Sequence, residues 1–398
     1  MSKCVTVYTQ AYNVENYIEQ CIKSVLSQTF QDFEWILVEN GSTDKTREII
    51  RKYAALDERI KPDYFDVNQD GFTNYYIAEK ADGRYIVKID SDDWIEPEYL
   101  EKLIAPFEDP DVDISICGAV NYEEETGRET PHEYGELDGV YSKSDIEKQF
   151  IEMRSYMGTY WGKMFRRGIF CSILPDMKEI GEKLKKGDNF GGDVAFALCY
   201  LGECKKLAFV NERMYHYRIH NNSYATRTIG TNRVFSCLTL RETEHHFLHK
   251  VNAYTEQNVI MVDLLFWQNI EQLFKNIIRA DWDTDQKIKT ISEVCANKDL
   301  QLLRKEAYNS KVRTILMGDI AWCYMNAGNS KYLKNVLMLL EPDIFDSISN
   351  ETYEWMRENQ ILMSYIIMGE FDNAKRYMEE ITTGNNVDYI RELQQRMH

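Results

Sequence analysis

The chain has 398 residues, of which 44% are hydrophobic and 28% charged, and its formal net charge at pH 7 is −18. This length predicts two or three domains with sizeable cores. The negative charge excludes a general nucleic-acid binder, which needs a basic face, so we expect no nucleic-acid partner.

Cysteine usage and apolar runs indicate the compartment. Nine cysteines, an odd number, are scattered without a Cys-x-x-Cys pair, which indicates neither a disulfide framework nor a zinc site. The N-terminus lacks the apolar core of a signal peptide, and no run approaches the roughly 18 apolar residues of a membrane span. We expect a cytoplasmic protein, either free or peripheral to the inner face of the cell membrane.

The first predicted elements alternate between strand and helix. An apolar run at 5–9 predicts a strand, and the apolar stripe of 13–26 predicts a helix. A second strand at 33–38 ends in the polar stretch Glu39–Asp44. Glu39 can accept hydrogen bonds from a nucleobase N–H or a ribose hydroxyl. The Gly-Ser-Thr-Asp part of the stretch has an alternative interpretation as a tight turn and a helix cap.

Another strand, predicted at 85–89, runs into the carboxylates of Asp90, Asp92 and Asp93. Asp-x-Asp spacing directs two carboxylates toward one point, which suits a hard divalent cation that takes further oxygens from phosphates and water. The alternative is that these residues only begin the helix opened by Pro97. The same spacing recurs, without a strand-like run before it, at Asp109 and Asp111, Asp111 and Asp113, Asp281 and Asp283, and Asp283 and Asp285.

The following elements continue the pattern. A helix is predicted at 97–107 and a strand at 112–120, and the acidic run 123–125 is interpreted as a solvated loop. Strands that alternate with helices predict an α/β fold with a parallel sheet.

Several motifs follow one another along residues 1 to about 225. They are Tyr12-Asn13, Glu39-Asn-Gly-Ser-Thr-Asp44, Asp90-Ser-Asp92-Asp93, Trp161-Gly-Lys163-Met-Phe-Arg166, Gly192-Asp193-Val194 and Tyr215-His-Tyr217-Arg218-Ile-His220-Asn-Asn-Ser223. Their order and spacing resemble those of the family 2 inverting glycosyltransferases. The resemblance implies a GT-A fold, which is Rossmann-like with a mostly parallel central sheet.

The chain also departs from the family's pattern. The usual residues are replaced at Gln10-Ala11 before the Tyr-Asn pair, at Glu39, at Asn40, at Gly192, and at Asn74-Tyr75 where the family has Arg-Asn. These positions concern nucleotide preference and donor-sugar contacts more than the class of reaction.

The resemblance implies a metal site and a catalytic base. Mn²⁺ or Mg²⁺ would be held by Asp92, with Asp90 and Ser91 nearby and His220 as a further ligand; an imidazole favours Mn²⁺. The alternative for His220 is a loop histidine bonded to backbone. Asp193 is the expected general base, with a plain N-cap as its alternative role.

The remaining implied contacts concern the base, the phosphates and the sugars. Tyr12 would stack on the nucleobase beside Asn13 and Glu39, and Lys163 would contact phosphate. Trp94 and Trp161 would offer flat surfaces to sugars. Core packing is the alternative for the aromatic residues and simple solvation for the lysine, and Asp188 is the reserve candidate for the base.

The implied activity is transfer of a sugar from a UDP-linked donor to a glycan, glycolipid or glycoprotein acceptor in polysaccharide synthesis. Two alternatives stay open: a nucleotidyltransferase of similar fold, and a scaffold that has lost catalysis. The domain boundary is expected near residue 230, with amphipathic helices over 231–398. The recurrence of Tyr324 and Gly328 as Tyr365 and Gly369 suggests tetratricopeptide-like hairpins at 311–383, or a plain helical bundle. Such a region could bind acceptor, form a homodimer or dock on a membrane.

Overall fold

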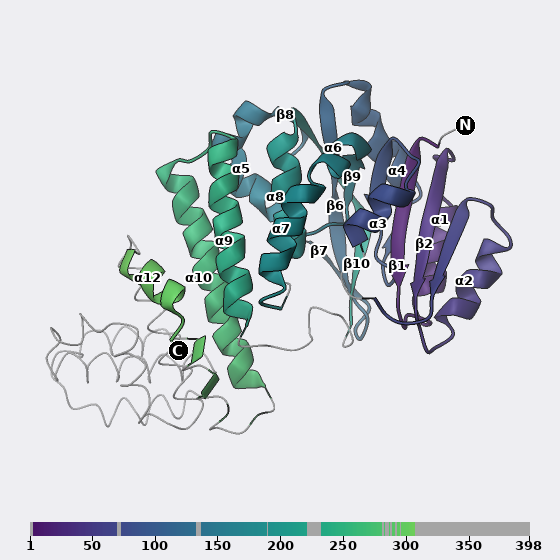
Figure 1. Cartoon of the computed structure of the whole chain (residues 1–398). Helices are drawn as coiled ribbons and strands as arrows, with labels where there is room; N and C mark the ends of the chain where they lie inside the picture. The colour runs from purple at the N-terminus through teal and green to yellow at the C-terminus, as the bar shows by residue number, and fades with distance from the viewer. Residues whose placement is uncertain are drawn as a thin grey trace, which may run out of the picture. The chain divides into compact units, whose positions relative to one another are not determined.

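Figure 1 shows the computed structural model of the chain. It describes residues 3–69, 73–132, 137–188, 190–220, 232–280, 282, 286, 289–290, 293–294 and 296–306. The first of two compact units consists of Met1–Thr228 together with Thr239–Val262. The predicted boundary at residue 230 and the predicted hairpins at 311–383 lie outside the described residues, so both stay predictions.

The described part of the first unit contains one mixed sheet of ten strands. Their spatial order is β3-β2-β1-β4-β9-β6-β10-β5, with β7 paired to β6 and β8 paired to β10. The strands are β1 (Val5–Ala11), β2 (Phe33–Asn40), β3 (Ile60–Phe65), β4 (Tyr85–Lys88), β5 (Trp94–Ile95), β6 (Val112–Glu123), β7 (Arg128–Pro131), β8 (Gly139–Ser142), β9 (Lys163–Arg166) and β10 (Lys206–Ile219). The four strands β3, β2, β1 and β4 are parallel, whereas β9 runs antiparallel between β4 and β6. The predicted α/β class is confirmed.

Helices of the first unit connect and cover these strands. They are α1 (Ile18–Leu26), α2 (Thr46–Ala54), α3 (Thr73–Lys80), α4 (Tyr99–Ile104), α5 (Ile146–Tyr156), α6 (Arg167–Ser172), α7 (Leu174–Leu184) and α8 (Gly192–Glu203), with 3₁₀ turns at Ala105–Glu108 and Lys143–Asp145. Helices α9 (Arg233–Lys250) and α10 (Glu256–Arg279) have residues in both units, and α12 (Lys298–Glu306) belongs to the second. In Figure 1, α1 and α2 lie beside β1 and β2 at the purple end of the ribbon.

Alternating side chains send each strand's apolar groups to both faces of the sheet. Val7 and Leu37 belong to the core that contains the buried residues of α1 and α4, whereas Tyr8 and Ile36 belong to the core that contains those of α5 and α8. A strand that is apolar on both faces is stable only when both are covered. The structure therefore has two cores, one on each side of the sheet.

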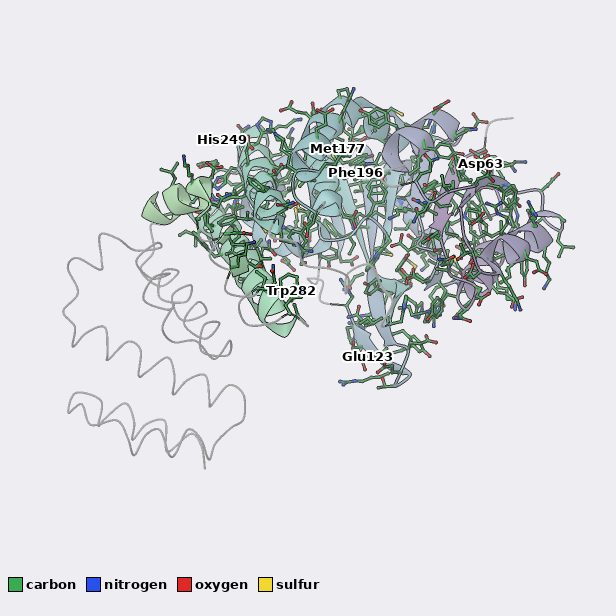
Figure 2. The ribbon with its side chains drawn as sticks, turned by 60° about the horizontal axis from the view of Figure 1, so that its bottom comes forward. Asp63, Glu123, Met177, Phe196, His249 and Trp282 are labelled. Carbon is green, nitrogen blue, oxygen red and sulfur yellow. The ribbon has the colours of Figure 1, made fainter. Side chains whose placement is uncertain are left out.

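Two strand features differ from the sequence prediction. Strand β3 was not predicted, and it carries Pro62 at the edge of the sheet, where the missing N–H leaves no ladder bond unmade. Strand β6 continues to Glu123 and pairs with β7, so the acidic run at 123–125 ends a hairpin instead of forming only a loop. Figure 2 shows Glu123 at the protruding end of this hairpin.

Among the residues that the structure describes, no helix has the length and apolarity needed to cross a membrane.

Helix α9 contributes a buried ion pair to the first unit. Arg154 of α5 donates to Glu244 of α9 at 2.7 Å, and the Glu244 side chain is 2% exposed. Burial raises the pKa of Glu244, while Arg154 opposes that rise. The pair joins two helices through residues that are 90 positions apart in the sequence.

We expect Glu244→Gln to lower the free energy of unfolding by about 1–3 kcal/mol, because the buried guanidinium of Arg154 loses its carboxylate partner. The matched control is Glu242→Gln on the same helix, where the carboxylate is 69% exposed and lies 3.4 Å from Lys183. An exposed pair contributes less than about 1 kcal/mol. Thermal unfolding of both variants measures the difference, and equal shifts would contradict the packing of α9 in the first unit.

Candidate active site

The candidate site lies at the carboxyl ends of the parallel strands β1, β2 and β4. Ala11 at the end of β1 is in register with Glu39 at the end of β2, and Tyr8 is in register with Lys88 of β4. The loops that follow these strands therefore meet at one edge of the sheet. In open α/β sheets this edge is where ligands bind.

The loop after β1 and the loop after β2 are joined by hydrogen bonds. The backbone N–H of Asn13 donates to the Ser42 hydroxyl at 3.1 Å, and the Asn13 side-chain oxygen accepts from the Thr43 N–H at 2.8 Å. Asn13 has a positive φ of 53°, which asparagine tolerates better than most residues. The N–H of Glu15 likewise donates to Asp44 at 3.0 Å. Asn13 is thus a structural part of the loop as well as a candidate donor contact.

Glu39 is enclosed by protein. Its side chain is fully buried, one oxygen accepts from the Ser42 N–H at 2.6 Å, and the other accepts from Arg47. Gly41, with φ at 77°, lies against the Val67 backbone so closely that a side chain would not fit. In this arrangement Glu39 holds the loop, whereas Tyr12, in the loop after β1, is 37% exposed.

The three carboxylates after β4 have different environments. Asp93 is buried and accepts from the Tyr215 hydroxyl at 2.7 Å and from the Arg218 N–H at 2.8 Å. Burial raises the pKa of Asp93, and the charges of Asp92 and Asp90 raise it further. Ser91 is also buried. Asp93 is therefore a structural anchor, while Asp90 and Asp92 remain partly exposed at 33% and 27%.

Asp92 lies beside His220, as the resemblance implies. His220 Nε2 is 3.0 Å from Asp92 Oδ2, although the two residues are 128 positions apart. Two adjacent ligands of an octahedral ion, each 2.0–2.1 Å from it, lie about 3 Å apart, so this pair fits two metal ligands. Among the residues described, no group of three or more such side chains gathers. Phosphate oxygens and water would supply the other ligands, as is usual for Mg²⁺.

Arg218 holds the metal motif in place, a role that the sequence analysis did not assign. Its side chain is 5% exposed, and its Nε donates to the Asp92 backbone oxygen at 2.8 Å. It also donates to Gln20 at 2.6 Å and pairs with Glu124, and its guanidinium lies 4.8 Å from the Trp94 ring centre. The Tyr-x-Tyr-Arg motif marks the residue in the sequence, but only the fold shows these partners.

Asp193 stands in the first turn of α8. The helix begins at Gly192, and its N-cap is Gly191 in a left-handed conformation with no side-chain cap bond. The alternative role of Asp193 as an N-cap is therefore wrong. Asp193 is an exposed residue, yet the surrounding protein removes enough water from its carboxylate to raise the pKa. Asp188, the reserve candidate, accepts from the Phe190 N–H at 3.3 Å.

Charged groups surround the Asp193 carboxylate. Burial raises its pKa most, Lys88 and Lys163 oppose that rise, and Asp90 adds to it. Lys88 Nζ lies 3.0 Å from Asp90 Oδ1. The candidate base and the metal motif are thus linked through Asp90 and Lys88.

Lys163 and Trp161 are buried, although the predicted contacts of Lys163 with phosphate and of Trp161 with a sugar need accessible side chains. Lys163 is 1% exposed, and its ammonium donates to the Thr159 backbone oxygen, the Thr159 hydroxyl and the Trp161 backbone oxygen at 2.6, 2.8 and 3.2 Å. Burial lowers the pKa of Lys163 to about 7. Trp161 is buried and stacks on Tyr215 with ring centres 4.4 Å apart, as core packing predicts. Trp94 is only partly buried and stacks on His216.

Comparisons with known proteins find similarity to glycosyltransferases. The family model described as glycosyl transferase family 2 matches residues 6–173. EpsH of Bacillus subtilis, named as a glycosyltransferase, is 30% identical over 305 residues, which cover 75% of this chain and 84% of that protein. The chondroitin synthase of Pasteurella multocida is 23% identical over 362 residues, which cover 90% of this chain and 34% of that protein.

A solved structure shares the fold. The crystal structure of Staphylococcus aureus TarS residues 1–349 in complex with UDP has a TM-score of 0.54 at 16% identity, covering 87% of this chain and 93% of that one. At this identity the likeness concerns the fold, which is that of GT-A glycosyltransferases.

Proposed function

Because this chain belongs to the family 2 glycosyltransferases, we propose that it transfers a sugar from a UDP-linked donor to a hydroxyl group of a glycan, glycolipid or glycoprotein, with inversion and with a divalent metal ion. One observation carries the proposal: His220 lies 3.0 Å from Asp92 in the motif that follows β4, and the charge of Asp90 in the same motif acts on the carboxylate of Asp193. Inverting transfer needs a group that stabilises the departing diphosphate and a base on the opposite side of the anomeric carbon.

On the donor side, Asp92 and His220 would hold Mn²⁺ or Mg²⁺, with Asp90 nearby. Bound there, the ion would neutralise charge on the departing phosphates. The imidazole of His220 favours Mn²⁺ over the harder Mg²⁺. Arg218 and Asp93 fix the backbone of the motif, so the ligands are already in position before a donor binds.

On the acceptor side, Asp193 would accept the proton of the attacking hydroxyl. A base must be ionised to act, and the cations Lys88 and Lys163 favour that form against the effect of burial. Because the carboxylate reaches solvent, an acceptor sugar can approach it.

The nucleoside would bind beside the joined loops. The half-exposed ring of Tyr12 would stack on the base, while Asn13 and Glu39 would define the loop that receives it. The TarS structure is a complex with UDP, which supports a uridine donor here. The names of relatives such as chondroitin synthase support an acceptor that is a growing polysaccharide.

The region beyond the first unit would serve acceptor binding, homodimer formation or peripheral attachment to the inner face of the membrane in a cytoplasmic enzyme. Its predicted amphipathic helices support such a role.

We expect UDP to raise the unfolding temperature only when Mn²⁺ or Mg²⁺ is present. The reason is that the diphosphate and the two protein ligands together would complete the coordination of the ion. At about 100 times its dissociation constant, UDP should add about 2.7 kcal/mol to the free energy of unfolding. A thermal-shift assay measures this with UDP and metal, with EDTA to remove the metal, and with GDP as the comparison nucleotide. Equal shifts with and without metal would contradict a metal-dependent donor site.

A further inference from the structure

We propose that Lys88 determines donor specificity by binding a neutral oxygen substituent, a hydroxyl or an amide carbonyl, of the transferred sugar. The inference rests on the proposed function and assigns a sugar-reading role within the same site. No motif of the sequence analysis singles out Lys88, which is the last residue of β4 and follows three buried residues.

Lys88 stands between the two halves of the site. Its Nζ lies 3.0 Å from Asp90 Oδ1, next to the metal motif. Nζ also lies over the Tyr160 ring, which packs against Phe196 of α8 with ring centres 4.4 Å apart, so the ammonium lies toward the helix whose first turn carries Asp193. The anomeric carbon must lie between the departing phosphate and the base. A cation in this position therefore faces the sugar ring.

The ammonium of Lys88 has donors to spare. It has three N–H groups. Among the described residues, Asp90 is the carboxylate that pairs with it. Its side chain is 18% exposed, and one side is covered by the Tyr160 ring, whose centre is 5.1 Å from Nζ. Lys163 forms the contrast, since it is enclosed and all three of its donors have protein partners. Lys88 is thus the lysine beside Asp193 that can donate to a ligand.

A hydroxyl group on the neighbouring strand also has unused hydrogen-bonding capacity. Tyr8 is in register with Lys88 on the adjacent strand, and its buried hydroxyl has no hydrogen-bond partner among the described residues. Leaving a buried hydroxyl unpaired costs about 1–3 kcal/mol. The buried region next to Lys88 therefore has hydrogen-bonding capacity that the described residues do not use.

The charge balance selects the class of substituent. Lys88 and Lys163 act on the carboxylates of Asp90 and Asp193, so even with both lysines charged this part of the site carries no net positive charge. A sugar carboxylate or a further phosphate would therefore find no net positive charge there to bind it. A neutral oxygen needs only a hydrogen-bond donor, which commits the proposal to hydroxyl or amide oxygens.

The test compares sugar-bearing ligands with the bare nucleotide. We would measure dissociation constants by calorimetry with Mn²⁺ for UDP, UDP-glucose, UDP-galactose, UDP-N-acetylglucosamine and UDP-N-acetylgalactosamine. The wild type should bind one UDP-sugar more tightly than its epimer. Lys88→Met should weaken that preferred UDP-sugar by about 10- to 100-fold, as expected for a hydrogen bond to a charged group, and should leave UDP within about threefold.

A matched control is Lys80→Met. The Lys80 ammonium also lies over a tyrosine ring, 5.6 Å from the centre of Tyr76, and 4.0 Å from Asp63, but on the exposed side of α3. This variant should bind all five ligands as the wild type does. Lys88→Arg keeps the charge between the carboxylates and therefore the fold, and its longer reach should change the order of sugar preference without changing UDP affinity.

Three results would overturn the inference: wild-type affinities equal for all five ligands, sugar preference unchanged in both Lys88 variants, or an equal loss for UDP and every UDP-sugar in folded Lys88→Met. The last would place Lys88 on the phosphate side. Absence of Mn²⁺-dependent UDP binding in the wild type is a separate result, because it would reject the proposed function itself.

Discussion

Replacing Asp193 by asparagine should lower the rate of sugar transfer by about 10²- to 10⁴-fold, the usual contribution of a general base. The amide has nearly the same shape but is unable to take the acceptor's proton. Metal-dependent binding of UDP should stay within a few-fold, because the role proposed for Asp193 is toward the acceptor and not toward the nucleotide. Transfer and binding are measured on the same preparation, and loss of both would place Asp193 on the nucleotide side.

The matched control for Asp193→Asn is Asp176→Asn. Asp176 is likewise an acidic residue in the first turn of a helix, α7, so both changes remove a charge that favours a helix N-terminus. Each should cost about 0.3–1 kcal/mol of stability. Transfer should be normal in Asp176→Asn. If Asp188→Asn abolished transfer while Asp193→Asn retained it, Asp188 would be the base.

Replacing Asp92 by asparagine should weaken metal-dependent UDP binding by about 100-fold or more, since even the outer partners of a metal ligand contribute 10- to 100-fold to affinity. With UDP at 100 times the wild-type dissociation constant, its stabilisation should fall from about 2.7 to about 0.4 kcal/mol. Thermal shift with Mn²⁺ and UDP measures this loss. Without ligand the unfolding temperature should change little, because the Asp92 side chain is partly exposed.

Asp111→Asn is the control for Asp92→Asn. Asp111 belongs to another Asp-x-Asp pair, is 48% exposed, and lies 3.0 Å from Lys205. Its loss should leave UDP binding and its metal dependence unchanged. If Asp92→Asn bound UDP with Mn²⁺ as the wild type does, Asp92 would not be a metal ligand.

The parts of the site that could be predicted are those in which the order of residues fixes position. Asp90 and Asp92 follow an apolar strand, so the edge of the sheet at which they lie follows from strand polarity alone. The same holds for the loop after Asn40, which ends the second strand. The placement of His220 beside Asp92, 128 residues away, depended on the family resemblance because no local pattern specifies it.

The parts that could not be predicted depend on which residue a polar side chain bonds to in the folded protein. Glu39 turns back to Ser42 and Arg47, and Lys163 turns inward to Thr159 and Trp161. In both cases the three-dimensional packing determines the partners, because a buried charge must be hydrogen-bonded or paired inside the protein. The start of α8 at Gly192 was also not predictable, since an aspartate before an apolar helix is a good N-cap by sequence.

The hydrogen bonds that join the loops after β1 and β2 affect how quickly and how tightly a nucleotide can bind. Ordering a flexible loop during association costs about 1–2 kcal/mol for each residue that becomes fixed. Here Asn13, Ser42 and Thr43 already hold one another in the ligand-free chain. The nucleoside side of the site is therefore preorganised, and little of the binding energy of the base and ribose is used to order these loops. Association there also needs no slow closure of the loops.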